Sequence, residues 1–458
     1  MQHKLNLKKL KVAVVSLGCA KNRIDTEEML GLLGRQGHII TGDPAAADAV
    51  IVNTCAFIED AQQESIDTLI KLARRVRGKK PVIIAAGCLA EFFGEKLLQS
   101  IPELSGVIGV HSYSQLTGFL ENCLTGTAQS CLSPAPEHYS SLGARLLTTP
   151  RHSVYVKIAE GCNNRCRYCL IPALRGPLRS RPAAAIIEEI RQLVRGGARE
   201  INLIAQDTTA YGTELSGAPD LASLVEQILA EVAEFPWLRI LYAYPSRLTG
   251  RLIDLIASEP RICKYLDLPL QHVSTTVLKR MGRPYTREHI IGLITRLRHS
   301  IPGLALRTTY LTGFPGETRE EFTELAEFLT AYPFEHVGVF AYSSQPGTAA
   351  AAMENQVIRR VARKRRRELM ERQQAVSLRL NRARLEQRLP VLVERRSAAH
   401  PHRYYGRTAG QAPEVDGGVC FLSAHPLMPG SFVSLKIGAA SPYHLLGFNP
   451  RPLQPLSK

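Results

Sequence analysis

The first 125 residues alternate short, β-branched apolar runs with polar or amphipathic sequence, and three of these runs end in a cysteine. The three runs are KVAVVSLGC, AVIVNTC and PVIIAAGC. This alternation is typical of parallel strands joined by helical crossovers. Because the carboxyl ends of parallel strands lie along one edge of their sheet, we expect Cys19, Cys55 and Cys88 to converge in space. A lone cysteine is most often a buried structural residue, whereas three in the same structural position favour a metal-cluster site.

A second series of strand-like runs begins at Ser153. A helix is expected in the segment AAAIIEEIRQLVRGGA, because its apolar residues recur at helical spacing and Gly196-Gly197 provides a stop signal. Six strand–helix units predict a partial or open (β/α) barrel, with the chemistry at the carboxyl ends of its strands. The six runs are VYVKIAE, INLIAQD, RILYAYP, YLDLPL, LRTTYLTGF and VGVFAYS.

The remaining segments divide the chain further. Residues 126–150 are rich in Ser, Thr, Ala and Pro and are expected to be a linker. A long basic helix containing RRVARKRRR is predicted over 357–389, followed by PVLVERR, YYGRTAG, GGVCFL and FVSLKIGAA, which alternate like the strands of a small antiparallel barrel. The chain is therefore an α/β protein with three predicted domains, at 10–125, 151–380 and 385–450.

Composition and charge limit the class of protein. The 458 residues carry a net charge of +16, which favours an anionic partner such as nucleic acid or a ribosomal assembly. No apolar run approaches the ~18 residues that cross a bilayer. The basic and apolar N-terminal stretch lacks a small-residue cleavage pattern, so a cytoplasmic location is expected. In a reducing compartment, clustered cysteines favour metal over disulfides.

The densest cysteine motif is EGCNNRCRYC, in which Cys162, Cys166 and Cys169 follow the first strand of the second series. A structural zinc site needs four closed ligands, and no fourth Cys or His stands at finger spacing. Three thiolates can instead hold three irons of a 4Fe-4S cluster and leave the fourth iron open. A reactive or incidental cysteine-rich loop is the alternative. The other cysteines share no such pattern and are read as structural: Cys123, Cys131, Cys263 and Cys420.

This motif closely resembles the radical S-adenosylmethionine (SAM) superfamily. The resemblance implies that the amino and carboxylate groups of SAM chelate the open iron. Tyr168 matches the position whose ring lies against the adenine. A second cluster with an open iron is expected at the three dispersed cysteines, so two 4Fe-4S clusters are predicted.

Further residues at strand ends are candidates for the SAM pocket. Gln206 and Asp207 end the second strand of the predicted barrel, and Gly313, Pro315 and Gly316 turn at the end of the fifth. For the last three, a simple tight turn is an equally good reading. The pair Gln271-His272 also follows a strand end, where a hydrogen-bonded structural role is the main alternative for the histidine.

The whole chain resembles the methylthiotransferases, which combine a three-cysteine domain, a radical SAM domain and a small TRAM barrel. These enzymes replace an unactivated C–H with C–S–CH3 and use SAM both as radical source and as methyl donor. The closest similarity is to the branch acting on ribosomal protein S12, and it implies methylthiolation of an aspartate β-carbon. It further implies an external electron donor such as flavodoxin or ferredoxin, and S12 either free or in the small subunit. The segments carrying this similarity are VSLGCAKNRIDTEEMLGLL, EGCNNRCRYCLIPALRGPLRSRP, IAQDTTAYG, DLPLQHVSTTVLKRMGRP and GRTAGQAPEVDG.

The charged residues of the C-terminal third favour two different kinds of partner, a basic protein and RNA. Glu414 and Asp416 would repel RNA phosphate at the barrel and suit a basic ribosomal protein. The basic helix is read either as a solvated face with an apolar inner side, or as a contact with ribosomal RNA or tRNA. The residues expected on that inner side are Val357, Val361, Leu369 and Leu380.

Two other functions are compatible with these patterns. A tRNA adenosine methylthiotransferase is favoured by the basic helix and disfavoured by the acidic barrel loop. A non-catalytic iron–sulfur protein, either an RNA-binding redox sensor or an electron carrier, belongs to a different class. Cleavage of SAM on reduction would exclude the latter.

Overall fold

The computed structural model describes residues 9–75, 81–126, 129–143, 145–217 and 219–452. These residues form two compact units. The first consists of 1–148, 160–163 and 169–179, and the second of 149–159, 164–168 and 180–458. The CNNRCRYC motif is shared between them, since Cys162 and Cys169 belong to the first unit and Cys166 to the second.

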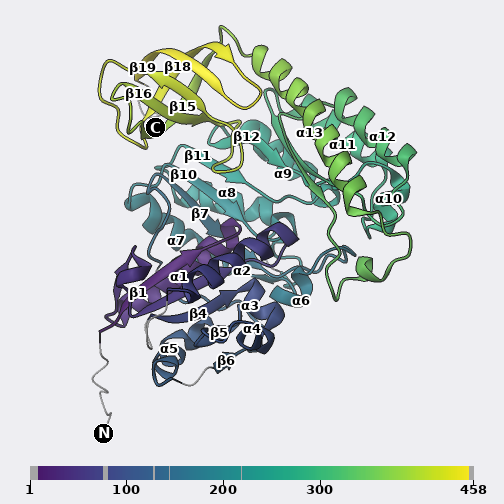
Figure 1. Cartoon of the computed structure of the whole chain (residues 1–458). Coiled ribbons are helices and arrows are strands. Elements are labelled where there is room, and N and C mark those ends of the chain that lie inside the picture. Colours follow the sequence, from purple (N-terminus) through teal and green to yellow (C-terminus); the bar gives the residue numbers. More distant parts are fainter. Residues whose placement is uncertain (1–8, 76–80, 127–128, 144, 218, 453–458) are drawn as a thin grey trace. The chain divides into compact units, whose positions relative to one another are not determined.

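The first unit is built on a six-stranded parallel sheet in the order β2-β1-β3-β4-β5-β6 (Figure 1). Every residue of β3 and β4 is buried, as expected of central strands covered on both faces. The predicted parallel arrangement of the three cysteine-ending runs is therefore confirmed. The strands are β1 (Lys11–Ser16), β2 (Ile39–Thr41), β3 (Ala49–Thr54), β4 (Val82–Gly87), β5 (Gly106–Ile108) and β6 (Gln129–Cys131).

Alternate residues of these strands supply two separate cores. One face packs Val50, Val52 and their neighbours against α2, α3, α4 and α6, and the other packs Ala49 and Ile51 against α1 and α5. This division follows from the two-residue period of a strand. The helices are α1 (Ala20–Arg35), α2 (Glu59–Ala73), α3 (Cys88–Phe93), α4 (Glu95–Ser100), α5 (Leu116–Leu124) and α6 (Ile171–Arg175).

The linker predicted over 126–150 is only partly irregular. Residues 129–131 form β6, which pairs in parallel with β5 and completes the sheet. The backbone N–H of Leu146 donates to the carbonyl of Glu27 (3.0 Å), and the Thr148 backbone N–H and hydroxyl both donate to the Glu27 carboxylate. The prediction missed β6 because three residues are too few to show a period. Residues 127, 128 and 144 of the segment lie outside the described residues.

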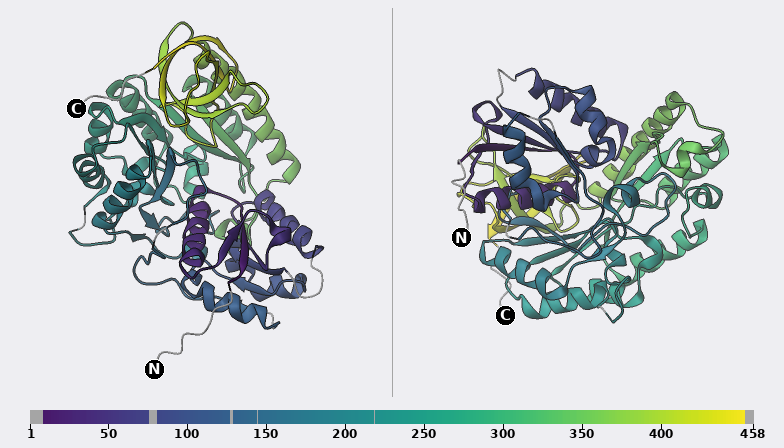
Figure 2. Two further views of the ribbon diagram at one scale, coloured as in Figure 1. Left: turned by 90° about the vertical axis from the view of Figure 1, so that its left-hand side faces the viewer. Right: turned by 90° about the horizontal axis from the view of Figure 1, so that it is seen from below.

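The second unit contains an open six-stranded parallel sheet in the order β14-β13-β12-β11-β10-β7. All six predicted strands are present in chain order, and the helix predicted to stop at Gly196 is α7. Helices line the outside of the curved sheet (Figure 2). The strands are β7 (Ser153–Lys157), β10 (Glu200–Ile204), β11 (Trp237–Ile240), β12 (Ile262–Asp267), β13 (Ala305–Thr312) and β14 (His336–Ala341), with the short β8 (Ala159–Glu160) and β9 (Arg179–Ser180) flanking the cysteine motif in the chain. The helices are α7 (Ala183–Arg195), α8 (Leu221–Glu231), α9 (Gly250–Ser258), α10 (Thr275–Arg280), α11 (Arg287–Ser300), α12 (Arg319–Ala331) and α13 (Arg359–Arg382).

The C-terminal strands close into a five-stranded barrel in the order β15-β16-β17-β19-β18, visible as a ring in the left view of Figure 2. The predicted small barrel is confirmed, but it is not wholly antiparallel, because β17 pairs with β19 in parallel. A closed ring with an odd number of strands needs at least one parallel pair, since strand direction must match after a full circuit. The strands are β15 (Arg388–Arg396), β16 (Arg403–Thr408), β17 (Val419–Leu422), β18 (Phe432–Ala440) and the unpredicted β19 (Leu445–Pro452).

Buried ion pairs fix the barrel to the amino ends of the parallel strands. Glu200, the first residue of β10, lies 2.9 Å from Arg239 Nη2 and 2.5 Å from Nη2 of the barrel residue Arg407. All three side chains are nearly fully buried. Trp237, the first residue of β11, makes an edge contact with Phe432 of the barrel. The barrel therefore lies at the opposite end of the strands from their carboxyl ends.

The acidic loop of the barrel is part of the same attachment, which corrects the prediction that both of its acids face a partner. The Asp416 side chain is fully buried, and Asp416 Oδ1 lies 2.6 Å from Arg307 Nη1. Tyr265 donates to Asp416 Oδ2 at 2.8 Å. Although burial raises the pKa of Asp416, His336 and Arg307 hold that pKa below its usual value. Only Glu414 is exposed, and it accepts a hydrogen bond from the Tyr155 hydroxyl (3.3 Å).

We expect Glu200→Gln to destabilise the second unit by about 3–5 kcal/mol, because it leaves the buried Arg239 without a carboxylate and Arg407 with Glu394 alone. Denaturant unfolding measures this change. Glu188→Gln, which removes an exposed carboxylate from α7, serves as the matched control and should change little. Equal effects of the two changes would contradict a role for the buried network.

Glu200 should also make the free energy of unfolding depend on pH. Burial raises the pKa of Glu200, but Arg407 and Arg239 outweigh it and hold the pKa well below the usual range. The stabilisation is therefore complete above the unfolded-state value of about 4.3 and is lost as the pH falls toward the lower folded-state value. Glu200→Gln should flatten the loss of unfolding free energy below about pH 4.3.

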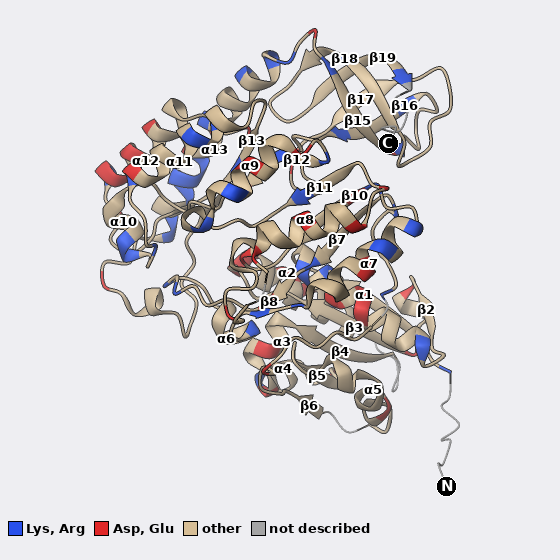
Figure 3. Ribbon diagram, turned by 180° about the vertical axis from the view of Figure 1, so that it is seen from behind, with Lys and Arg blue, Asp and Glu red and all other residues tan. Residues whose placement is uncertain are grey.

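The predicted basic helix is α13, which spans 359–382 and so ends before the predicted 389. It ends early because Leu389 belongs to β15. The predicted inner side is present in part: Leu369 is buried and Val361 and Leu380 are half-buried, but Val357 precedes the helix, which begins at Arg359. Figure 3 shows its dense run of basic residues. No helix within the described residues is long and apolar enough to span a membrane.

Candidate functional site

Three cysteines follow three adjacent strands at the carboxyl edge of the first sheet. Cys19 precedes α1 after β1, Cys55 follows β3 directly, and Cys88 begins α3 directly after β4. The three strands are neighbours in the order β1-β3-β4. The structure therefore brings together the residues that the sequence separates by up to 69 positions, counted from Cys19 to Cys88.

A close backbone approach makes this convergence possible. Gly18 has φ +88°, and a Cβ at this position would lie 2.8 Å from Cys55 Cβ and 3.0 Å from Cys55 Sγ. A larger residue would therefore push the first cysteine loop away from the second. The buried Ser65 of α2 accepts the Cys55 N–H at 3.0 Å and so fixes the second loop.

Burial shapes the acidity of these thiols. Burial, together with the neighbouring Cys88 and Cys19, raises the pKa of Cys55 to about 12. The pKa of Cys88 is also raised by burial, against the opposing effect of Arg175. The bare thiols of Cys55 and Cys88 keep their protons at neutral pH, so an incoming metal must displace those protons on binding.

Three cysteine thiols are a donor set that suits an iron–sulfur cluster. Within the described ranges, no three His, Cys, Asp or Glu side chains are arranged to hold one metal ion. In a 4Fe-4S cluster each cysteine thiolate binds a different iron. The three cysteine sulfurs therefore surround the whole cluster and do not converge on a single metal ion. Three mutually interacting thiols at one sheet edge match that requirement.

The second cysteine group lies between β8 and α6. In the first unit, the Cys162 N–H donates to the Gly176 carbonyl (3.1 Å) and the Ile171 N–H lies 3.5 Å from Cys169 Sγ. In the second unit, the Arg167 N–H donates to the Met281 carbonyl at 3.0 Å. Backbone N–H groups at three points of the loop, in Cys162, Arg167 and Ile171, are thus hydrogen-bonded.

Tyr168 is fixed in the second unit by a buried arginine. Arg283 Nη2 donates to the Tyr168 hydroxyl at 2.7 Å, and the guanidinium lies 4.7 Å from the centre of the Tyr244 ring. The half-buried Tyr168 ring contacts Phe314 edge-on, with 6.4 Å between ring centres. Arg283 was not predicted from the sequence, because its partner lies 115 residues away.

The second strand end of the barrel carries a charged cluster. Asp207 is 2% exposed and accepts hydrogen bonds from Asn164 (2.8 Å) and Arg247 (2.6 Å). Asn164 belongs to the cysteine loop and Arg247 to the turn after β11, so Asp207 joins two strand ends. Gln206 lies beside it and is half-buried. The prediction that these two residues belong to the carboxyl edge agrees with this placement.

The Gly313–Gly316 turn is braced by packing as well as by its glycines. A Cβ on Gly313 would lie 2.9 Å from the Cα of Ala362 in α13. The buried Glu317 carboxylate accepts the backbone N–H groups of Gly313 and Phe314 and lies 3.3 Å from Arg365. These contacts support the structural reading of the turn, while Phe314 brings it against Tyr168.

His272 is fully buried and accepts the Ser274 N–H on Nδ1 at 3.0 Å. Burial lowers the pKa of His272 to about 3, so the ring is neutral at physiological pH. Its neighbour Gln271 has φ +70°, and Tyr242, which follows β11, has φ +61°. Left-handed backbone at two non-glycine strand ends stores strain of the kind found at functional sites, and sequence pattern gives no sign of it.

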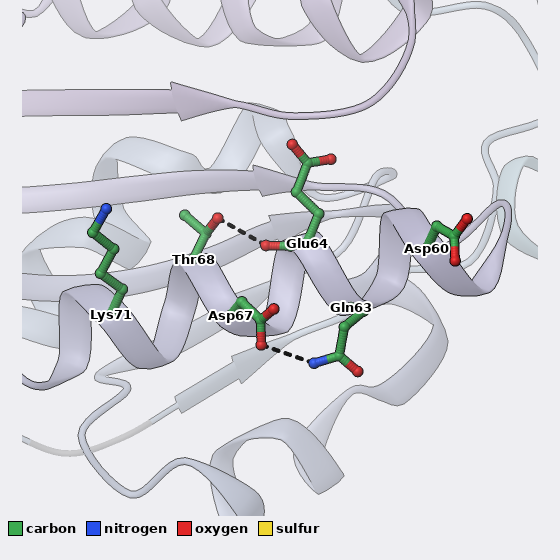
Figure 4. Close-up of a pocket in the computed structure, with 6 residues that line it drawn as sticks. All are labelled: Asp60, Gln63, Glu64, Asp67, Thr68 and Lys71. Carbon is green, nitrogen blue, oxygen red and sulfur yellow. Dashed lines mark hydrogen bonds between the residues drawn. The ribbon is translucent and has the colours of Figure 1, made fainter.

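A surface hollow of about 450 Å³ on α2 does not belong to this site (Figure 4). Its hydrogen bonds are local to one helix, between Gln63 and Asp67 (2.8 Å) and between Thr68 and the Glu64 carbonyl (2.8 Å). It is a solvated helix face. Its lining residues are Asp60, Gln63, Glu64, Asp67, Thr68 and Lys71.

Three family models match successive parts of the chain. The uncharacterized protein family UPF0004 matches residues 11–109, the radical SAM superfamily matches 156–329, and the TRAM domain matches 387–448. Each range falls on one of the three parts described above: the first sheet, the open parallel sheet and the closed barrel.

Full-length relatives extend this likeness. Proteins named ribosomal protein uS12 methylthiotransferase RimO from Trichlorobacter lovleyi and Desulforudis audaxviator are 44% and 46% identical over 443 and 436 residues. These alignments cover 96% and 95% of this chain, and 98% and 96% of the relatives. The chain belongs to the RimO family. A relative of the same name from Geobacter sulfurreducens is 45% identical over 441 residues.

Solved structures show that the fold of this RimO family member extends to more distant radical SAM proteins. The methyltransferase TsrM from Kitasatospora setae, with cobalamin and a [4Fe-4S] cluster bound, aligns with a TM-score of 0.54 at 15% identity and covers 75% of this chain and 74% of TsrM. The cobalamin-dependent enzyme OxsB aligns with a TM-score of 0.51 at 13% identity, covering 80% of this chain and 57% of OxsB. At these identities the likeness concerns the fold alone.

Proposed function

We propose that this protein is a methylthiotransferase that modifies the β-carbon of an aspartate of ribosomal protein uS12 in the cytoplasm. The observation that carries the proposal is the full-length likeness to uS12 methylthiotransferases. It covers all three parts of the chain, which we assign to residues 10–125, 151–380 and 385–450. Asp416 does not contribute to the choice of substrate, because it is engaged inside the protein, and only Glu414 of the acidic loop is exposed.

Two 4Fe-4S clusters and SAM are the cofactors. We assign the first cluster to Cys162, Cys166 and Cys169, and the auxiliary cluster to the three cysteines at the first sheet edge, Cys19, Cys55 and Cys88. When bound, the first cluster supplies the electron that cleaves SAM, and the auxiliary cluster supplies the sulfur.

The protein's own groups position the reactants. Arg283 holds the Tyr168 hydroxyl, which keeps the ring where the adenine is expected. Asp207 joins Asn164 of the cysteine loop to Arg247, so the loop and the strand ends form one rigid edge. We assign Gln206, Asp207 and the turn of Gly313, Pro315 and Gly316 to the lining of the SAM pocket.

The basic face of α13 supports an RNA contact during substrate recognition. Five exposed arginines line a hollow of about 440 Å³ on this helix. A ribosomal protein in its assembled subunit is surrounded by RNA phosphate, which such a face attracts. The arginines are Arg359, Arg360, Arg363, Arg366 and Arg367.

Reversing two of these charges tests that contact. We expect the Arg360→Glu/Arg363→Glu variant to bind assembled small subunits about tenfold more weakly, with a shallower salt dependence. Activity on free uS12 should be unaffected. The matched control, Arg379→Glu/Arg382→Glu, changes the charge equally at the far end of the same helix. Equal weakening by both pairs would mean that net charge, rather than this face, is responsible.

Mass spectrometry of parallel anaerobic reactions tests the function. Reconstituted protein, a flavodoxin or ferredoxin reducing system, SAM and sulfide are mixed with uS12, with unmodified small subunits, or with undermodified tRNA. A methylthio increment on one aspartate of uS12, with tRNA unchanged, is the expected result. An increment on a tRNA adenosine would overturn the substrate. Two loaded clusters without SAM cleavage would indicate a non-catalytic iron–sulfur protein.

A further inference from the structure

One buried arginine of the first unit contacts a predicted ligand of the auxiliary cluster. Arg175 is 3% exposed, and its Nη2 lies 3.2 Å from Cys88 Sγ. The same nitrogen donates to Asn22 Oδ1 at 2.7 Å, and Asn22 Oδ1 lies 3.6 Å from Cys88 Sγ. The guanidinium is therefore aimed at the sulfur that would bind iron.

Two carboxylates orient this guanidinium. Arg175 Nη1 lies 2.7 Å from Asp25 and 3.3 Å from Glu160. Both carboxylates face the buried guanidinium and balance its charge. A buried cation is costly unless it is paired, so the arginine is held charged and in one orientation.

The position of Arg175 in the chain adds a second connection. It is the last residue of α6, a five-residue helix that begins two positions after Cys169. Its partner Glu160 stands two positions before Cys162. Glu160 and Arg175 belong to the first unit, as does Cys88. One side chain thus ties the auxiliary sheet edge to both ends of the cysteine motif.

We propose that Arg175 is a positioning residue that sets the reduction potential of the auxiliary cluster through its N–H···S bond to Cys88 and anchors the cysteine-motif loop beside it. A hydrogen bond and a positive charge at a ligating sulfur favour the reduced, more negative cluster. Removing Arg175 would also leave Asp25 and Glu160 without their shared cation. Both effects lower the potential.

The experiment isolates the auxiliary cluster in the full-length chain. In a Cys162→Ala/Cys166→Ala/Cys169→Ala background, the protein is reconstituted anaerobically with iron and sulfide, its iron content is measured, and its one-electron reduction is followed by EPR at poised potentials. The variants compared are Arg175→Met, Arg175→Lys and Arg179→Met. Arg179 is the matched control, because this buried arginine donates to two backbone carbonyls, those of Pro177 and Arg175.

Arg175→Met should reduce the ratio of reduced to oxidised cluster at a fixed potential by about tenfold, which is about 59 mV for one electron. Arg175→Lys should recover most of this ratio, and Arg179→Met should leave it unchanged. Full iron content with an unchanged potential in Arg175→Met would overturn the proposal. An equal shift in Arg179→Met would also overturn it, by showing a general effect of repacking.

The iron content of the variants provides a second measurement if Arg175→Met does not retain its cluster. Recovery of iron in Arg175→Lys would support the charged contact, and loss in both variants would overturn it. The inference rests on the auxiliary cluster proposed above. Failure of that assignment is distinguishable, because the triple-cysteine background would then bind no iron although Arg175 is intact.

Discussion

Cys55→Ala should abolish methylthiolation while leaving SAM cleavage in place. The substitution removes one of the three ligands proposed for the auxiliary cluster, so about half of the iron should be lost and product should fall by about 100-fold or more. The cysteines of the CNNRCRYC motif are unchanged, so reductive formation of 5′-deoxyadenosine should continue. Iron analysis and mass spectrometry of the same preparation measure the three quantities.

Cys123→Ala is the matched control for this change. Cys123 is buried in the same unit at 1% exposure, and burial likewise raises its pKa to about 12. It belongs to α5 and not to the carboxyl edge, so iron content and product should be unaffected. Full activity of Cys55→Ala, or equal loss in both variants, would contradict the assignment of the auxiliary site.

Cys166→Ala should abolish both SAM cleavage and methylthiolation. We assign this residue as one of three thiolates of the cluster that would bind SAM, and without it 5′-deoxyadenosine formation should fall by about 100-fold or more. The auxiliary cluster is held by other residues, so about half of the iron should remain. Cys420→Ala, on strand β17 of the barrel, is the control expected to retain activity. SAM cleavage at the normal rate by Cys166→Ala would contradict the assignment.

The strands and the convergence of the cysteines could be predicted because both depend on local pattern. Buried parallel strands such as β3 and β4 are continuous apolar runs, and a cysteine that ends such a run must lie at the carboxyl edge. Six further strands of the open sheet were found in the same way. The family resemblance then assigned a chemistry that spacing alone leaves open.

The sequence could not show the contacts that join distant segments. Arg175 meets Asp25 across 150 positions, and Arg407 meets Glu200 across 207. Nothing in the local sequence distinguishes these arginines from solvated ones. For the same reason the sequence predicts that Asp416 faces a partner, although its carboxylate forms an ion pair with Arg307 inside the protein. Short elements such as β6 are missed because three residues define no period.

The most direct test of the central claim uses uS12 whose aspartates carry two deuterium atoms on the β-carbon. The modified aspartate is predicted to gain a methylthio group and keep one deuterium, with the other recovered in 5′-deoxyadenosine by mass spectrometry. Product that keeps both deuterium atoms, or 5′-deoxyadenosine without deuterium beside a modified tRNA, would contradict the function proposed for this chain.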